Sequence, residues 1–140
     1  MALLDLASGD SVWRGVDYHN NHEVKTWELT GPDSYDGTVQ GTELYSVHID
    51  LEHPRRSTCT CPFAAGRRVI CKHMVALYFK VVPGSYETFM DEVRQWEAED
   101  QKRAQQHRKD LEKYVKSLTK AELQQQLLAL LIEREERHFW

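Results

Sequence analysis

The sequence lacks several features that would define a class of protein. In its 140 residues there is no run of eighteen apolar residues, so no segment predicts a transmembrane helix. The opening Met1 to Ala7 stretch is too short and too acidic for a secretory signal. We therefore expect a cytoplasmic protein with reduced thiols and no membrane partner. The formal net charge of −4 favours no class of ligand.

Acidic residues are missing from one part of the chain. Residues 53–86 hold six basic and no acidic side chains. Residues 1–52 hold two basic and ten acidic ones, and residues 87–140 hold ten basic and twelve acidic ones. The middle of the sequence is therefore a basic island between acidic neighbours.

Cysteine is scarce too, and the three cysteines lie close together with a histidine. The four residues are Cys59, Cys61, Cys71 and His73. Their spacing is C-x-C, then nine residues, then C-x-H, which provides two close pairs of soft or borderline ligands for a tetrahedral zinc ion. Pro62 and Gly66 allow the connector to turn back, so that the second pair arrives at the start of an apolar helix.

Other interpretations of the cysteines are open. They could be buried apolar residues, with the histidine at the surface. Cys71 and His73 could form a nucleophile and base, although no third catalytic group is evident. Disulfides would leave one thiol unpaired. We favour one structural Zn²⁺ and no catalytic residue, because four protein ligands leave no open position on the metal.

The pattern C-x-C-x(n)-C-x-H before an apolar helix resembles the SWIM zinc finger, most closely its bacterial type. The resemblance covers about residues 11 to 82. Besides the ligand region it includes the following stretches: Arg14-Gly15-Val16-Asp17-Tyr18, Val39-Gln40-Gly41, Tyr45 to Ile49, and Cys71 to Ala76. Its implication for the metal site is that the three cysteines and His73 occupy the ligand positions.

The resemblance also implies a type of function. Proteins with this finger include chromatin-remodelling-type helicases, Mutator-like transposases and ubiquitin ligases, and the finger is taken to bind DNA or proteins without being an enzyme. The sequence departs from the bacterial pattern in having the single aromatic Tyr18 where two are frequent. It has no helicase, transposase or ligase motif.

The expected fold class is α+β: a small antiparallel β-sheet with a zinc-binding ββα finger, followed by C-terminal α-helices. Strands are predicted at 23–30, 38–40 and 44–51 by alternation, with turns at Gly31-Pro32-Asp33 and Asp36-Gly37. An extended segment follows at 57–61, with 68–70 returning beside it. Apolar residues at helical spacing predict a helix over 72–82.

We expect two domains, a finger domain with its N-terminal strands at 1–84 and a helical extension at 85–140. The extension is predicted to hold a helix at about 85–117, with Ser85 as N-cap, and a second at about 120–137, opened by a capping box from Thr119 to Glu122. The leucines of the second helix need an apolar partner. The final Phe139-Trp140 suggests a docking tail or a chain cut from a longer protein.

The basic island yields the candidate nucleic-acid-binding residues, which are Arg55, Arg56, Arg67, Arg68, Lys72 and Lys80. Six phosphate contacts to a duplex would make log K fall with log salt at a slope near −5, from about −0.9 per contact. Alternatively, the cations only balance the charge of three zinc thiolates. The main rival function is a protein-interaction adaptor or self-association through the C-terminal leucine helices. Redox sensing by the cysteines is a third.

Overall fold

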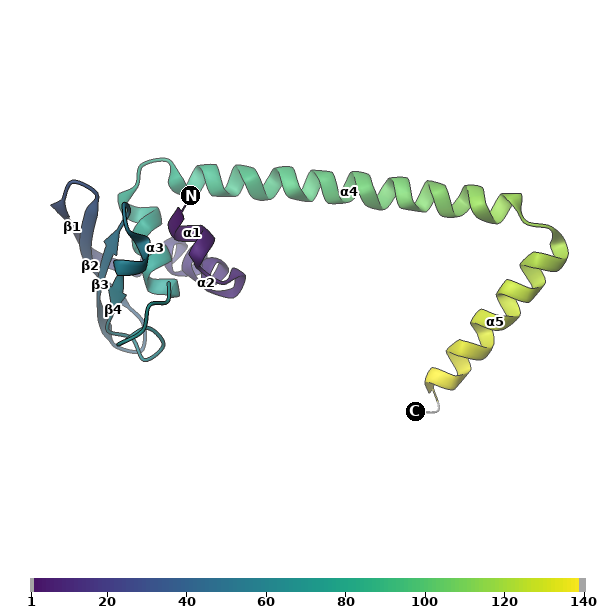
Figure 1. The fold of residues 1–140 in the computed structure, drawn as a ribbon, viewed down its shortest axis with the longest axis horizontal. Coiled ribbons are helices and arrows are strands. Elements are labelled where there is room, and N and C mark those ends of the chain that lie inside the picture. Colours follow the sequence, from purple (N-terminus) through teal and green to yellow (C-terminus); the bar gives the residue numbers. More distant parts are fainter. Residues whose placement is uncertain (1, 139–140) are drawn as a thin grey trace. The chain divides into compact units, whose positions relative to one another are not determined.

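The computed structural model describes residues 2–138, so Phe139-Trp140 lies outside the described residues. By packing, the chain divides into two compact units, residues 1–91 and 92–140. The first unit is an α+β domain and the second is entirely helical, as Figure 1 shows. The division falls inside a long helix, α4.

The first unit is built on a four-stranded antiparallel sheet. Its strands are β1 (Val24–Gly31), β2 (Ser34–Gln40), β3 (Leu44–Asp50) and β4 (Thr58–Cys59). They pair in chain order, β1-β2-β3-β4. The expected antiparallel sheet is confirmed, and the strand that leads into the metal site is its fourth member.

Two local predictions about strands are wrong. Asp36-Gly37 is not a turn, because it lies within β2, where Gly37 faces Trp27 of β1 and Val47 of β3. Residues 68–70 do not return beside β4. Ile70 instead forms a parallel bridge with Ala7, and residues 60–71 are largely irregular.

Alternation along the strands decides which side of the sheet is buried. In β3, Tyr45, Val47 and Ile49 are buried, while Leu44 and Ser46 are exposed. The buried side packs against α3 (Lys72–Val81), which contacts β1, β2 and β3. The core of the unit therefore lies between the inner side of the sheet and this helix.

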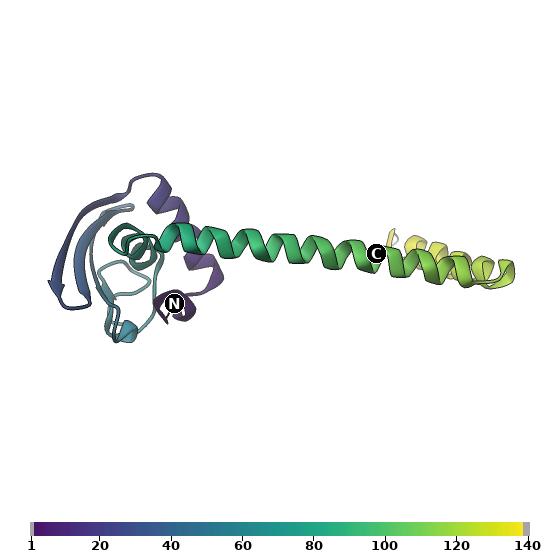
Figure 2. The same ribbon diagram turned by 90° about the horizontal axis from the view of Figure 1, so that it is seen from above.

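A third layer covers the other side of α3. The N-terminal helices are α1 (Ala2–Leu6) and α2 (Gly9–Asn20), and α2 packs along α3 (Figures 1 and 2). Ser8 caps α2, since its hydroxyl accepts a hydrogen bond from the Ser11 amide at 3.1 Å. Because α3 is covered from both sides, His73 to Phe79 are all buried, which is a wider surface than the predicted apolar stripe.

The helix predictions for the C-terminal half are largely confirmed. The helices are α4 (Ser85–Ser117) and α5 (Lys120–His138). The capping box forms, with the Thr119 amide donating to Glu122 at 2.9 Å and the Glu122 amide donating to the Thr119 hydroxyl at 3.2 Å. Ser85 is not an N-cap: it begins the helix, and its hydroxyl donates to the Val82 carbonyl at 2.8 Å.

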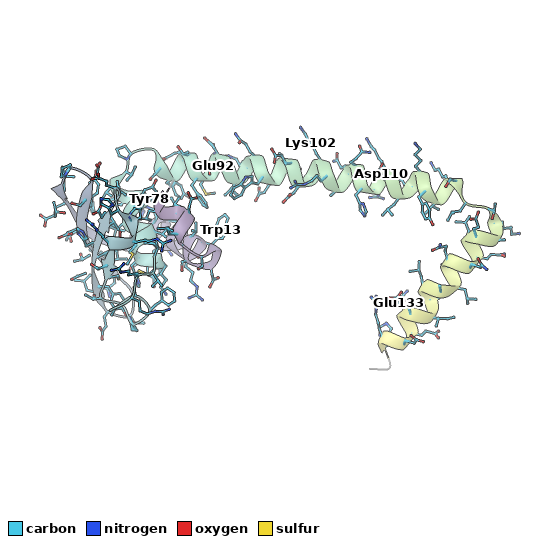
Figure 3. All side chains as sticks on the ribbon, in the orientation of Figure 1. Trp13, Tyr78, Glu92, Lys102, Asp110 and Glu133 are labelled. Atoms are coloured by element: carbon cyan, nitrogen blue, oxygen red, sulfur yellow. The ribbon has the colours of Figure 1, made fainter. Side chains whose placement is uncertain are left out.

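The second unit has almost no interior. Side chains along α4 and α5, among them Lys102, Asp110 and Glu133, project outward in Figure 3. Within the part of the chain that the structure describes, no helix is both long and apolar enough to cross a membrane.

Candidate metal centre

Four buried side chains from three consecutive segments meet at one end of the core. Cys59 ends β4, where it pairs with Val47 of β3, and Cys61 follows two residues later. Cys71 is the N-cap residue of α3, and His73 lies in the first turn of that helix. The C-x-C and C-x-H pairs are therefore held by a strand end and a helix start, with an irregular loop between them.

The potential ligand atoms are close to the spacing that zinc requires. The three sulfurs and a ring nitrogen of His73 all lie within 4.8 Å of one another. His73 Nδ1 is 3.7 Å from the Cys59 sulfur and 3.8 Å from the Cys71 sulfur. Tetrahedral zinc with bonds near 2.3 and 2.0 Å places sulfur and nitrogen about 3.6 Å apart. The group fits one zinc ion with little movement.

The His73 ring packs against two tyrosines. Its centroid is 5.1 Å from that of Tyr18 in α2 and 4.7 Å from that of Tyr45 in β3. Nδ1 points to the sulfurs, while the buried Nε2 has no hydrogen-bond partner among the described residues. A Cβ at Gly41 would lie 2.8 Å from Tyr45 Cε2 and 3.2 Å from this Nε2. Gly41 therefore makes room for the ligand ring.

Protons are distributed unevenly over the thiols. The pKa of Cys71 is lowered, chiefly by a hydrogen bond with Cys59 and further by His73 and the Met74 amide. The pKa of Cys59 is raised, chiefly because it keeps the proton of that same hydrogen bond, and then by burial. Backbone amides at a helix start favour a thiolate, which is the form that binds a metal.

These observations define a closed Cys₃His centre of the zinc-finger class. All four ligands come from the protein and each is at most 4% exposed, so no position is left for a substrate or a reactive water. When bound, the zinc ion would crosslink the end of β4, the loop that follows it and the start of α3. Cys59, Cys61, Cys71 and His73 are positioned to hold it.

Comparison with protein families identifies the finger. Residues 45–81 match the family model described as SWIM zinc finger, a span that contains all four ligands. This part of the chain is therefore similar to a SWIM zinc finger, and its three cysteines and one histidine are positioned to hold one zinc ion. Comparisons with curated proteins and with solved structures give no match.

Four of the six predicted basic residues come together. Arg55 and Arg56, in the 3-10 turn Pro54–Arg56, and Arg67 and Arg68, in the loop between the ligand pairs, line one hollow of about 930 Å³. All four side chains are exposed. Within residues 2–138, none of their guanidinium groups forms a salt bridge. We call this surface the arginine hollow.

The two lysines lie elsewhere. The Lys72 ammonium stands 5.2 Å over the Tyr18 ring, and Lys72 lines a second hollow together with three of the four metal ligands, Cys61, Cys71 and His73. Lys80 stands 4.6 Å over the Trp27 ring. Eight residues of α-helix separate the two lysines by about 12 Å along the axis of α3, at 1.5 Å per residue. The six basic residues are therefore close together in the sequence but occupy three separate places in the structure: the arginine hollow, the Tyr18 ring and the Trp27 ring.

Sequence reasoning missed several contributors to these sites. Tyr45 was expected only as an alternating strand residue, yet it packs on the ligand histidine. Asp5 and Glu52 line the arginine hollow and reduce its positive charge. No sequence pattern connects Asp5 to the loop, because the N-terminal segment is brought there by tertiary packing.

Proposed function

We propose that this protein is a non-enzymatic nucleic-acid-binding module of the cytoplasm, organised by its structural zinc. The observation that carries the proposal is the arginine hollow. Arg55, Arg56, Arg67 and Arg68 face one concave surface, and no carboxylate of residues 2–138 is in salt-bridge contact with them. Guanidinium groups match phosphate geometry, and exposed unpaired ones beside a rigid scaffold suit a nucleic-acid backbone.

The alternative, that the cations serve only to neutralise the zinc thiolates, has less support. The backbone amides of Met74 and Cys61 lower the pKa of Cys71 and of Cys59 respectively, and so favour the thiolate forms. Within the described residues, no arginine is hydrogen-bonded to a ligand sulfur. Arg67 instead donates to the Phe63 carbonyl at 3.2 Å and lies over the Phe63 ring. The arginines therefore remain available to an external anion.

Charge predicts that the binding is weak and sensitive to salt. Asp5 and Glu52 offset part of the charge of the four arginines. Four phosphate contacts give a slope of log K against log salt of about −3.6 on a duplex and about −2.8 on a single strand. Because Lys72 and Lys80 stand apart from the hollow, we expect these slopes for four contacts in place of the steeper slope expected for six contacts. Phosphate contacts do not read sequence, so we expect tolerance of different sequences.

The test is a titration of labelled single- and double-stranded DNA and RNA at about 50 and about 200 mM salt. The altered proteins are Arg67→Ala/Arg68→Ala and Arg55→Ala/Arg56→Ala. Lys102→Ala/Arg103→Ala, in the exposed part of α4, removes the same charge elsewhere and is the matched control. Zinc content is measured in each preparation.

We expect both arginine pairs to weaken binding while zinc stays stoichiometric, and the α4 control to bind as the unaltered protein does. The salt slope should become shallower by about 2 for each pair, at about 0.9 per lost contact. Absence of binding at low salt, or equal losses in the control, would refute the assignment to the arginine hollow.

A further inference from the structure

The second unit carries an apolar surface that nothing in the described chain covers. Nine large apolar residues, in the last turns of α4 and along α5, are between 38% and 61% exposed. In α4 they are Leu111, Tyr114 and Val115, and in α5 they are Leu123, Leu127, Leu128, Leu130, Leu131 and Ile132. We call this set the leucine face. It is not used by the zinc site or by the arginine hollow.

The spacing of the leucine face indicates packing against several helices. In α5, the residues from Leu123 to Leu131 follow i, i+4, i+7 and i+8 spacing, and Leu128 and Ile132 widen the stripe. At 100° per residue the apolar arc covers roughly 200° of the helix. A two-stranded coiled coil needs only a narrow seam, whereas a helix in a bundle presents a wider face to its neighbours.

The area agrees with a contact between two copies. Burying one leucine fully corresponds to roughly 60–120 Å², from 1.5–3 kcal/mol at about 25 cal/mol per Å². These nine side chains are about half exposed, so at roughly 30–60 Å² each they offer roughly 300–500 Å² per chain. A standard interface buries about 800 Å² on each partner. Two leucine faces joined together would therefore supply about half of such an interface as its apolar centre, and the polar flanks of the same helices would supply the rest.

The charges also favour a second copy of the same unit. Residues 92–138 carry ten basic and ten acidic side chains. They are unevenly placed: residues 102–120 hold seven basic and two acidic ones, and residues 121–138 hold two basic and four acidic ones. Two copies of a neutral unit do not repel each other. The positive end of α4 in one copy complements the negative α5 of the other.

We infer that the leucine face is a homodimer interface, in which the end of α4 and all of α5 from two copies form a four-helix bundle. The partner is a second copy of this chain. A dimer would also carry two arginine hollows, so a nucleic acid long enough to reach both would bind more tightly through avidity. Only this consequence rests on the proposed function.

Sedimentation velocity of the full chain from about 1 to about 100 μM tests the interface. Leu127→Glu/Leu131→Glu places two charges in the middle of the leucine face. Gln126→Glu/Ala129→Glu adds charges on the opposite side of the same helix and is the matched control. Zinc content and far-UV circular dichroism of all three proteins confirm that the finger and the helices remain folded.

We expect the unaltered protein and the control to sediment as dimers at about 10 μM, and the leucine variant to dissociate at least about 100-fold more readily. A wild-type monomer at every concentration would overturn the inference. Rapid amide exchange in α5 of that monomer would then point to an unlike protein partner, and slow exchange to α5 folding back on α4.

The DNA titration separates this inference from the proposed function. A monomeric protein that still loses binding on Arg67→Ala/Arg68→Ala would sink the dimer and leave the arginine hollow standing. A dimer that binds no nucleic acid would support the homodimer interface and refute nucleic-acid binding at the arginine hollow.

Discussion

Removing the metal should unfold the first unit's finger. The direct perturbations are chelation and Cys71→Ala, which removes the ligand that begins α3. The loop between the ligand pairs has little support of its own, because residues 60–71 contain only turns, bends and the single bridge of Ile70. β4 is only two residues long. Without zinc, three sulfurs and a histidine remain buried with little else to hold them together.

The magnitudes indicate that this loss is decisive. Structural zinc contributes on the order of 10–16 kcal/mol in finger peptides. A domain of this size is stable by only about 5–15 kcal/mol. The metal therefore accounts for most or all of the stability margin of the finger.

The assay is thermal unfolding followed by near-UV circular dichroism, with zinc quantified in the same sample. Near-UV signal is appropriate because Tyr18 and Tyr45 pack against the ligand histidine. The matched control is Lys72→Ala, which alters the residue between two ligands and leaves the ligand set intact. Chelated protein and Cys71→Ala should lose the aromatic signal at 25 °C, while Lys72→Ala should keep it and its zinc.

A native near-UV spectrum and a cooperative transition at unchanged temperature after complete metal removal would refute this reasoning. It would mean that the hydrophobic core between the sheet and α3 is sufficient to hold the four side chains together. A loss of signal in Lys72→Ala equal to that in Cys71→Ala would also count against it, because the loss would then not depend on the ligand.

Three further predictions follow from the packing and the caps. Gly41→Ala should lower the melting temperature and speed zinc loss to a chromogenic chelator, because its Cβ would meet Tyr45 at 2.8 Å and the ligand ring at 3.2 Å. The control Glu43→Ala, which alters an exposed side chain two residues later, should do neither. Gly15→Ala should destabilise the first unit by about 1–3 kcal/mol in denaturant unfolding with zinc retained, because its Cβ would lie 2.4 Å from Val75 Cγ1. The pKa of Glu122 is lowered by the Thr119 amide, so the stabilisation of the α5 start should be complete above the ordinary glutamate pKa and be lost as pH falls through the lowered pKa. A carboxyl titration by NMR should show the low midpoint for Glu122, and Thr119→Ala should raise that midpoint.

The ligand set could be predicted from the sequence because its information is local. Two closely spaced pairs of ligands, with a proline and a glycine between them, specify the site almost independently of the rest of the fold. The alternation of β3 and the capping box of α5 are local in the same sense. Each follows from residues that are neighbours in the chain, so no tertiary contact had to be known.

The failures share the opposite property. Asp36-Gly37 has the composition of a turn, yet Gly37 is required within β2 because a Cβ there would lie 2.5 Å from the Thr26 carbonyl oxygen and 2.7 Å from Leu77 Cδ1. Lys72 and Lys80 are grouped with the arginines along the chain, but the helix carries them away from the arginine hollow. Both outcomes depend on where distant segments cross, which periodicity does not encode.

The tertiary contacts also explain why a segment more than forty residues before the first cysteine belongs to the metal site. Gly15 lets α2 approach α3 closely, and one turn later Tyr18 reaches the ring of His73. The same ring also packs against Tyr45, so α2 and β3 meet at a single ligand. Zinc binding fixes the orientation of this ligand and thereby couples the N-terminal helix, the sheet and α3. The finger and the layers around it should consequently unfold as one cooperative unit, with the metal at the point where all of them converge.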